Sequence, residues 1–194
     1  AIGPTVEGIA VRYWLPTAIT LGRLIIVPVA VYLIVQERHG AAFWLFVLAG
    51  VSDALDGFLA RHFNAISRIG AFLDPLADKA LVVAIFVTLG WLGRMPLWLV
   101  FLVVFRDILI VGGAVLYHTL THALRMEPLW ISKINTTAQL LLAGLILAHL
   151  GLGVFAPDVT DVAMYAVAAL TILSGASYVW TWGKRAMAYE HHSS

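Results

Sequence analysis

The sequence contains no cysteine and few charged residues. With no Cys among 194 residues, disulfides, iron–sulfur clusters and thiol catalysis are excluded. Charged residues make up 12% of the chain and hydrophobic residues 61%, a composition that a soluble surface of this size would not tolerate. The formal net charge is only +1, whereas a protein that binds a phosphate backbone normally carries a basic patch, so we expect no nucleic acid partner. The sequence therefore predicts a protein whose main solvent is lipid.

Long apolar stretches are present instead, separated by polar or Gly-containing joints. They suffice for six helices of about 20 residues each, and they leave only short loops and no room for a separate soluble catalytic domain. We therefore predict an all-α polytopic membrane protein with six transmembrane helices, forming a single domain over residues 1–194. The predicted spans are Thr17–Gln36, Ala41–His62, Ala71–Leu92, Met95–Thr119, Leu129–Leu150 and Val159–Trp182.

The two ends of the chain differ from these spans. Apolar and charged residues alternate over residues 1–14 and predict a short amphipathic helix on the membrane surface, with an irregular lead-in as the alternative. Residues 186–194 form a tail, and because terminal residues can be added for expression we assign them no function. Basic residues of the joints gather on the side of both termini, so the positive-inside rule predicts termini and active site facing the cytoplasm of a bacterial inner membrane.

Four aspartates lie near the ends of the second and third spans on that predicted cytoplasmic side. Asp53 and Asp56 stand i,i+3, and Asp74 and Asp78 stand i,i+4, so each pair shares one helix face. A short joint brings these faces together, and four close carboxylates cannot all stay ionised without cations. Oxygen ligands without cysteine favour Mg²⁺ or Mn²⁺, and two such ions form the usual clamp for displacement at phosphorus.

Neighbouring residues fit a phosphate site, although two other interpretations are open. Gly57 and Gly70 remove side chains where a ligand must approach, and Arg61 offers a planar fork for phosphate oxygens. One alternative is that the acids form structural ion pairs with nearby basic residues, namely Arg23, Arg61, Arg68 and Lys79. The other is a transporter with a cation site, against which stand the clustering of the acids at one membrane face and the lack of an internal repeat.

Eight residues fill every fixed position of the pattern D-x2-D-G-x2-A-R-x8-G-x3-D-x3-D. They are Asp53, Asp56, Gly57, Ala60, Arg61, Gly70, Asp74 and Asp78. This motif resembles that of the CDP-alcohol phosphatidyltransferase family, and the resemblance covers roughly Leu15 to Arg185. It implies a six-helix membrane enzyme, usually a homodimer, that transfers the phosphatidyl group of CDP-diacylglycerol to an alcohol and releases CMP.

The resemblance also implies roles for individual residues. Two Mg²⁺ or Mn²⁺ ions would be held by Asp53, Asp56, Asp74 and Asp78, and Asp78 would also be the general base. The CMP and diphosphate site would be lined by Gly57, Ala60, Arg61 and Gly70, with Thr20 and Arg23 of the first span close by. The first span departs from the family at one position, because Thr17 follows Pro16 where the family usually has Asn.

Polar residues on spans four and five indicate where the acceptor alcohol binds. We expect Arg106, Asp107, Lys133 and Asn135 to contact it. In the phosphatidylglycerophosphate synthases of the family, the comparable sequence pattern looks like Arg-Glu in span four and Gly-Lys-x-Lys-Thr in span five. Here Asp107 replaces that Glu, and Asn135 replaces the second Lys. One cation fewer favours phosphatidylglycerol over the more highly charged glycerol 3-phosphate. The chain thus resembles the cardiolipin synthases of the family most, with a phosphatidylglycerophosphate synthase as the alternative.

Overall fold

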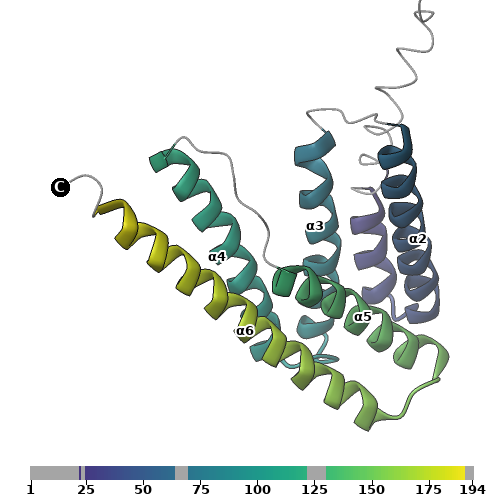
Figure 1. Ribbon diagram of the computed structural model, residues 1–194. Helices are drawn as coiled ribbons and strands as arrows, with labels where there is room; N and C mark the ends of the chain where they lie inside the picture. The colour runs from purple at the N-terminus through teal and green to yellow at the C-terminus, as the bar shows by residue number, and fades with distance from the viewer. Residues whose placement is uncertain (1–21, 23–24, 64–69, 122–129, 191–194) are drawn as a thin grey trace, which may run out of the picture.

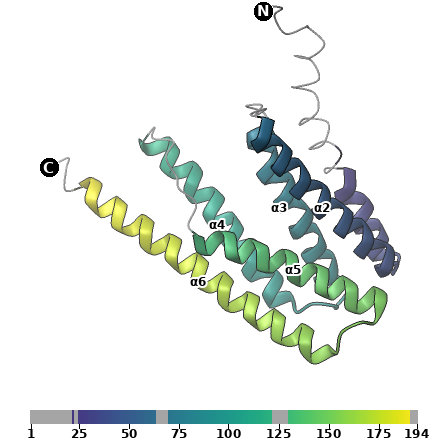
Figure 2. The same cartoon turned by 45° about the vertical axis from the view of Figure 1, so that its right-hand side comes forward.

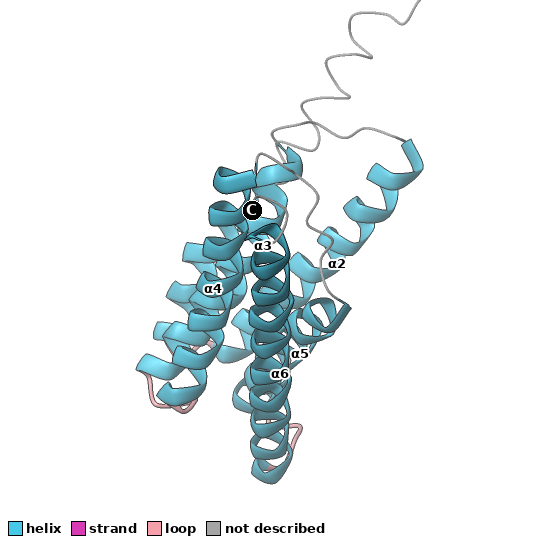
Figure 3. Ribbon diagram, turned by 60° about the vertical axis from the view of Figure 1, so that its left-hand side comes forward, coloured by secondary structure: helices cyan, strands magenta, loops and turns pink. Residues whose placement is uncertain are grey.

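A computed structural model describes residue 22 and residues 25–63, 70–121 and 130–190, with side chains for residues 22, 25–52, 79–113 and 130–181. Every regular element in these ranges is an α-helix (Figures 1 and 3), so the all-α prediction is confirmed for the described part of the chain. A helical stretch at Ile25–Val35 precedes the labelled helices. These are α2 His39–Phe63, α3 Gly70–Trp91, α4 Leu97–Thr121, α5 Trp130–Leu152 and α6 Pro157–Glu190.

Helix α5 lies at the centre of the bundle. It packs against α2, α3 and α6, while α4 packs against α3 and α6 (Figures 1 and 2). The described joints lie together at the lower end of the bundle in Figure 3. There Arg94 Nη2 lies 3.7 Å from Glu37 Oε1, and a Cβ added to Gly40 would lie 3.3 Å from the carbonyl oxygen of Gly151. The helices therefore run alternately up and down, as a chain that crosses a layer repeatedly must do.

Two of these joints begin with the same backbone motif. At Glu37–Arg38 and at Gly93–Arg94, the two N–H groups that follow the helix donate back to carbonyls three and five residues earlier. The first residue of each pair has a positive φ, 56° at Glu37 and 68° at Gly93. Glycine adopts this conformation freely, whereas it costs a residue with a side chain about 1–2 kcal/mol. The joint at Glu37 is therefore the more strained of the two.

The predicted spans match the described helices closely, with one exception. Both ends of α2, α3, α4 and α5 lie within about two residues of the predicted spans. Helix α6 begins at Pro157, a residue suited to a first helical position, but it continues past the predicted end at Trp182 to Glu190. The stretch after Gly183 contains neither Gly nor Pro, so the loss of apolar residues there marks the predicted edge of the lipid and not the end of the helix.

Two helical stretches in the described part of the chain are long and apolar enough to cross a membrane. They are Trp130–Leu152 and Pro157–Thr181. Shorter apolar helices lie at Ile25–Val35, His39–Ser52 and Lys79–Trp91. The expectation of six spans therefore stays a prediction.

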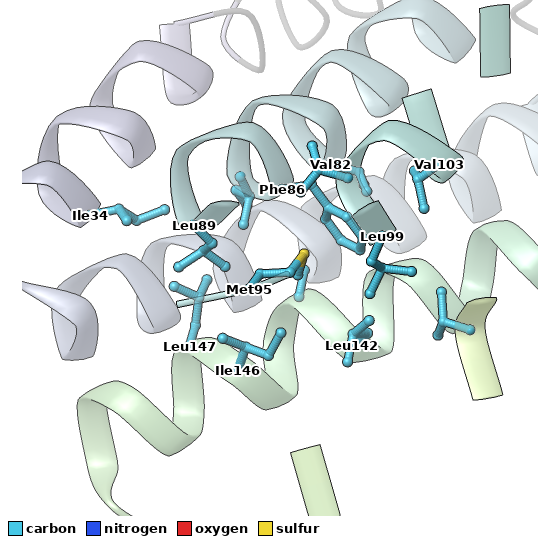
Figure 4. Packing of buried hydrophobic residues seen from close by; sticks show 14 of the residues in the cluster. Ile34, Val82, Phe86, Leu89, Met95, Leu99, Val103, Leu142, Ile146 and Leu147 are labelled. Carbon is cyan, nitrogen blue, oxygen red and sulfur yellow. The ribbon is translucent and has the colours of Figure 1, made fainter. Parts of the chain in front are cut away.

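The core between the helices is built from apolar stripes at helical spacing (Figure 4). Helix α3 contributes Val82, Phe86 and Leu89, and the facing residues of α4 and α5 are Leu99, Val103, Leu142, Ile146 and Leu147. Glycine allows the closest approach between α3 and α4, because a Cβ at Gly90 would lie 2.7 Å from Val100 Cγ2. The helices are thus held by packing of apolar and small residues, as is usual within membranes.

Candidate active site

The buried stripes of α4, α5 and α6 change from apolar to polar towards the same end of the bundle. On α4 the stripe Leu99–Val103 continues with Arg106, and on α6 the stripe Met164–Val167 continues with Thr171 and Ser174. On α5 the order is reversed with the chain direction, so Asn135 and Gln139 precede Leu142 and Ile146. These polar residues, with their contacts, form the polar cluster: Lys79, Arg106, Asp107, Ser132, Asn135, Gln139, Thr171 and Ser174.

Arg106 lies at the centre of the polar cluster and is only 3% exposed. Its Nη1 donates to Asp107 Oδ1 at 2.7 Å, and its Nη2 donates to Ser132 Oγ and to Ser174 Oγ, each at 2.6 Å. One guanidinium therefore joins α4 to α5 and α6. A buried cation is strongly destabilising unless it is paired and hydrogen-bonded, and these three contacts supply that compensation.

Asp107 pairs with a second cation, Lys79 of α3. Lys79 Nζ lies 2.8 Å from Asp107 Oδ1, although the orientation of this ion pair is not that of a hydrogen bond. Lys79 directly follows Asp78 in the sequence, so the ion pair fixes α3 against α4 next to the predicted general base. The ion pair described for Lys79 is thus with Asp107, which is not one of the four aspartates of the motif. Two cations and one carboxylate leave these three residues with a formal charge of +1.

Asn135 is fully buried and does not satisfy its whole amide with the described residues. Thr171 Oγ1 lies 2.7 Å from the carbonyl oxygen of Val167 and 3.0 Å from Asn135 Oδ1. A hydroxyl has one proton, so Thr171 donates to only one of them. If the proton goes to the nearer Val167, the amide must turn its nitrogen towards Thr171, which leaves Oδ1 without a partner. In either orientation one polar atom of Asn135 has no partner in the described protein.

Hydrogen-bond donors are in excess in the polar cluster. Within the described part of the chain, three nitrogen atoms are buried there without a partner, namely Arg106 Nε, Asn135 Nδ2 and Gln139 Nε2, while Lys79 Nζ is paired with Asp107 only. Each buried donor without a partner costs about 1–3 kcal/mol of stability. We therefore expect a ligand with hydrogen-bond acceptors to bind where several such donors lie together. Phosphate and hydroxyl oxygens are such acceptors, and the positive charge favours an anion.

The residues of the eight-position motif lie on α2 and on α3, and α3 also carries Lys79 of the cluster. Those from Asp53 to Arg61 belong to α2, and Gly70, Asp74 and Asp78 belong to α3, while Thr20 and Arg23 lie outside the described residues. Side chains of the motif are also outside the described set, so the predicted metal site stays a prediction.

Of the predicted acceptor residues, the structure brings together Arg106, Asp107 and Asn135 but not Lys133. Lys133 is exposed, and its Nζ lies 5.0 Å from the centre of the Trp130 ring in a cation–π contact. Five further members of the cluster were not predicted as individual site residues: Lys79, Ser132, Gln139, Thr171 and Ser174. A signal existed for two of them, because Ser132, Asn135 and Gln139 recur at i, i+3 and i+7 and so share one helix face.

The geometry thus defines a class of protein. The described residues form a helical bundle, and its interior holds a positively charged polar cluster that is rich in hydrogen-bond donors. Residues 13–173 match the model of the CDP-alcohol phosphatidyltransferase family. The chain therefore belongs to this family.

Individual relatives carry two different activities in their names. The chain is 35% identical over 150 residues to the cardiolipin synthase (CMP-forming) of Homo sapiens, a match covering 69% of this chain and 50% of that protein. It is 36% identical over 182 residues to the CDP-diacylglycerol–glycerol-3-phosphate 3-phosphatidyltransferase 1 of Oryza sativa, covering 84% and 55%. The Bacillus subtilis CDP-diacylglycerol–glycerol-3-phosphate 3-phosphatidyltransferase is 28% identical over 180 residues, covering 84% and 92%. The chain thus spans about half the length of the human protein.

Proposed function

We propose that this protein transfers the phosphatidyl group of CDP-diacylglycerol to phosphatidylglycerol, forming cardiolipin and CMP. Membership of the family supports the reaction class, and the similarity to cardiolipin synthases supports the acceptor. The observation that carries the choice of acceptor is the charge of the polar cluster. Lys79, Arg106 and Asp107 together carry +1, which matches the single negative charge of a phosphodiester such as phosphatidylglycerol. Glycerol 3-phosphate, a phosphomonoester, carries close to two negative charges at neutral pH and calls for a further cation.

The proposed setting is a membrane that the chain crosses six times, with termini and active site on the cytoplasmic side of a bacterial inner membrane. Two apolar helices support the membrane setting, and the alternating helix directions support repeated crossing. We further propose that the enzyme is a homodimer and that residues 1–194 act as one domain. A site near the membrane surface would keep the acyl chains of both substrates in lipid while the nucleotide reaches water.

The chemistry of the donor set fits a pair of Mg²⁺ or Mn²⁺ ions. Asp53, Asp56, Asp74 and Asp78 offer oxygen ligands only, which hard divalent cations prefer. When bound, such ions would neutralise the diphosphate of CDP-diacylglycerol and the charge that develops on the leaving group. Gly57, Ala60, Arg61 and Gly70, with Thr20 and Arg23, are proposed to hold the CMP and diphosphate part of the substrate.

The reaction is a single displacement at phosphorus. A glycerol oxygen of phosphatidylglycerol forms a bond to the lipid-bearing phosphorus, and the bond from that phosphorus to CMP breaks. Asp78 would accept the proton of the attacking hydroxyl. Arg106 and Lys79 would hold the phosphate of the acceptor, at the level of α3 where Asp78 precedes Lys79.

Substitution of the proposed base tests this function. Purified protein in detergent with CDP-diacylglycerol, phosphatidylglycerol and Mg²⁺ should release CMP, and both EDTA and Asp78→Asn should abolish the release. Asp161→Asn, which changes an exposed aspartate of α6, is the matched control and should retain activity. CMP release that persists in Asp78→Asn at the wild-type rate would remove Asp78 as the base.

A further inference from the structure

Helix α6 contains no residue of the eight-position motif, yet it contacts two of the residues predicted to bind the acceptor, Arg106 and Asn135. Ser174 accepts a hydrogen bond from Arg106 Nη2 at 2.6 Å, and Thr171 bonds to the amide of Asn135. Both α6 side chains are buried, at 0% and 1% exposure. They stand i,i+3 on α6 and face Ser132 and Asn135, which stand i,i+3 on α5. Two matched layers of polar contacts therefore join the helices.

These contacts determine which donors stay free. Arg106 Nη2 carries two N–H groups, and Ser132 and Ser174 accept both of them, while Nη1 is engaged by Asp107. The buried Nε is left without a partner. Thr171 likewise occupies one end of the Asn135 amide and leaves the other end unpaired. The hydroxyls of α6 thus orient both side chains so that each keeps one buried polar group available.

We propose that Ser174 and Thr171 are positioning residues for the acceptor, which hold Arg106 and Asn135 so that their free groups receive the phosphate and glycerol oxygens of its headgroup. This inference rests on the proposed function. It adds α6 to the acceptor site, together with Gln139, whose buried Nε2 is also unpaired and lies one turn along α5 from Asn135. Neither α6 residue touches the reacting atoms, so the expected effect is on acceptor binding and not on the chemical step.

The test separates the two substrates by steady-state kinetics in detergent micelles. Ser174→Ala and Thr171→Val each remove one hydroxyl at nearly constant volume. Each should raise the KM for phosphatidylglycerol about threefold to tenfold, the equivalent of one net hydrogen bond. The KM for CDP-diacylglycerol and kcat should stay within about twofold of wild type. The conservative variants Ser174→Thr and Thr171→Ser keep the hydroxyl and should restore the KM for phosphatidylglycerol.

Two further variants guard against a purely structural effect. Thr160→Val removes a hydroxyl that is also buried in α6, at 6% exposure, but bonds to the carbonyl of Pro157 outside the polar cluster, so it should leave both KM values unchanged. Ser132→Ala removes the other acceptor of Arg106 Nη2 and should reproduce the effect of Ser174→Ala, so the test does not depend on one variant folding.

The outcomes distinguish this inference from the proposed function. An unchanged KM for phosphatidylglycerol in Ser174→Ala and Thr171→Val, or a parallel loss of kcat and both affinities, would overturn the role of α6. A wild type that uses only glycerol 3-phosphate would overturn the proposed acceptor, and the same variants would then test α6 through the KM for glycerol 3-phosphate. A wild type that uses neither acceptor would overturn both proposals before any variant is made.

Discussion

Lys79 Nζ and Asp107 Oδ1 lie 2.8 Å apart and join α3 to α4 one residue after Asp78. The same Asp107 oxygen accepts a hydrogen bond from Arg106 Nη1 at 2.7 Å, so one carboxylate serves two cations. This arrangement connects the helix that carries two of the proposed metal ligands with the polar cluster proposed to bind the acceptor. It also sets the charge of the polar cluster, because removal of the carboxylate would leave the two cations facing each other.

Asp107→Asn is therefore expected to affect both stability and acceptor preference. Breaking a buried ion pair from one side costs about 3–5 kcal/mol, and the lower end applies because the Lys79 side chain keeps 29% of its exposure. The formal charge of Lys79, Arg106 and residue 107 rises from +1 to +2, so the ratio of glycerol 3-phosphate to phosphatidylglycerol use should increase. Thermal unfolding in detergent and CMP release with each acceptor measure the two effects. Asp158→Asn, an exposed aspartate in the first turn of α6, is the control and should change neither.

Asn135→Lys tests the same electrostatic argument without breaking an ion pair. Asn135 is 0% exposed beside Thr171, so a lysine at this position adds a cation inside the polar cluster. We expect phosphatidylglycerol use to fall and the ratio of glycerol 3-phosphate to phosphatidylglycerol use to rise by about tenfold, which corresponds to 1.4 kcal/mol. Thr137→Lys places the same charge on an exposed position of α5 and should leave the ratio as in wild type. An equal ratio in both variants would mean that the charge of the polar cluster does not select the acceptor.

Lys133→Gln is expected to have little effect on either acceptor. Lys133 is exposed beside Trp130 and is separated by about 100° around the helix from Ser132, which faces Arg106. The KM for phosphatidylglycerol should stay within about twofold of wild type, because an exposed cation is screened and contributes less than about 1 kcal/mol. A tenfold rise in this KM would return Lys133 to the acceptor site predicted from the sequence.

The backbone contact between α2 and α5 should make Gly151 intolerant of any side chain. A Cβ at this position would lie 2.6 Å from Gly40 Cα and 2.6 Å from the carbonyl carbon of His39, neither of which can move without shifting α2. Gly151→Ala should therefore destabilise the protein by about 1–3 kcal/mol, measured by thermal unfolding in detergent. Gly112→Ala in α4 is the control, because nothing lies within 4 Å of its added Cβ, and the helix should be unaffected or slightly more stable. Equal melting temperatures for the two variants would contradict the close packing.

The sequence predicted the helices well because apolar length and polar joints are strong signals in a membrane protein. Helix α5 was expected at Leu129–Leu150 and is found at Trp130–Leu152. The end of α6 was missed because hydropathy reports where lipid is expected to end, and the polar stretch from Lys184 to Glu190 consists of residues that continue a helix readily.

The polar cluster was predicted only in part, for a physical reason. Arg106, Asp107 and Asn135 stand out because charged and amide groups are costly within a membrane. Serine and threonine give no such signal, since their hydroxyls often bond to the preceding turn of their own helix. Thr136 and Thr137 do this, whereas Ser132 and Ser174 bond to Arg106. Only the packing of α4, α5 and α6 distinguishes these two cases.

The choice of phosphatidylglycerol as acceptor is tested most directly by supplying both acceptors in parallel. Purified protein is given CDP-diacylglycerol and Mg²⁺ with either labelled phosphatidylglycerol or labelled glycerol 3-phosphate, with EDTA in matched reactions, and the lipid products are separated. We predict labelled cardiolipin and equimolar CMP from phosphatidylglycerol, and no product with EDTA. Label that enters lipid only from glycerol 3-phosphate would contradict this account and make the protein a phosphatidylglycerophosphate synthase.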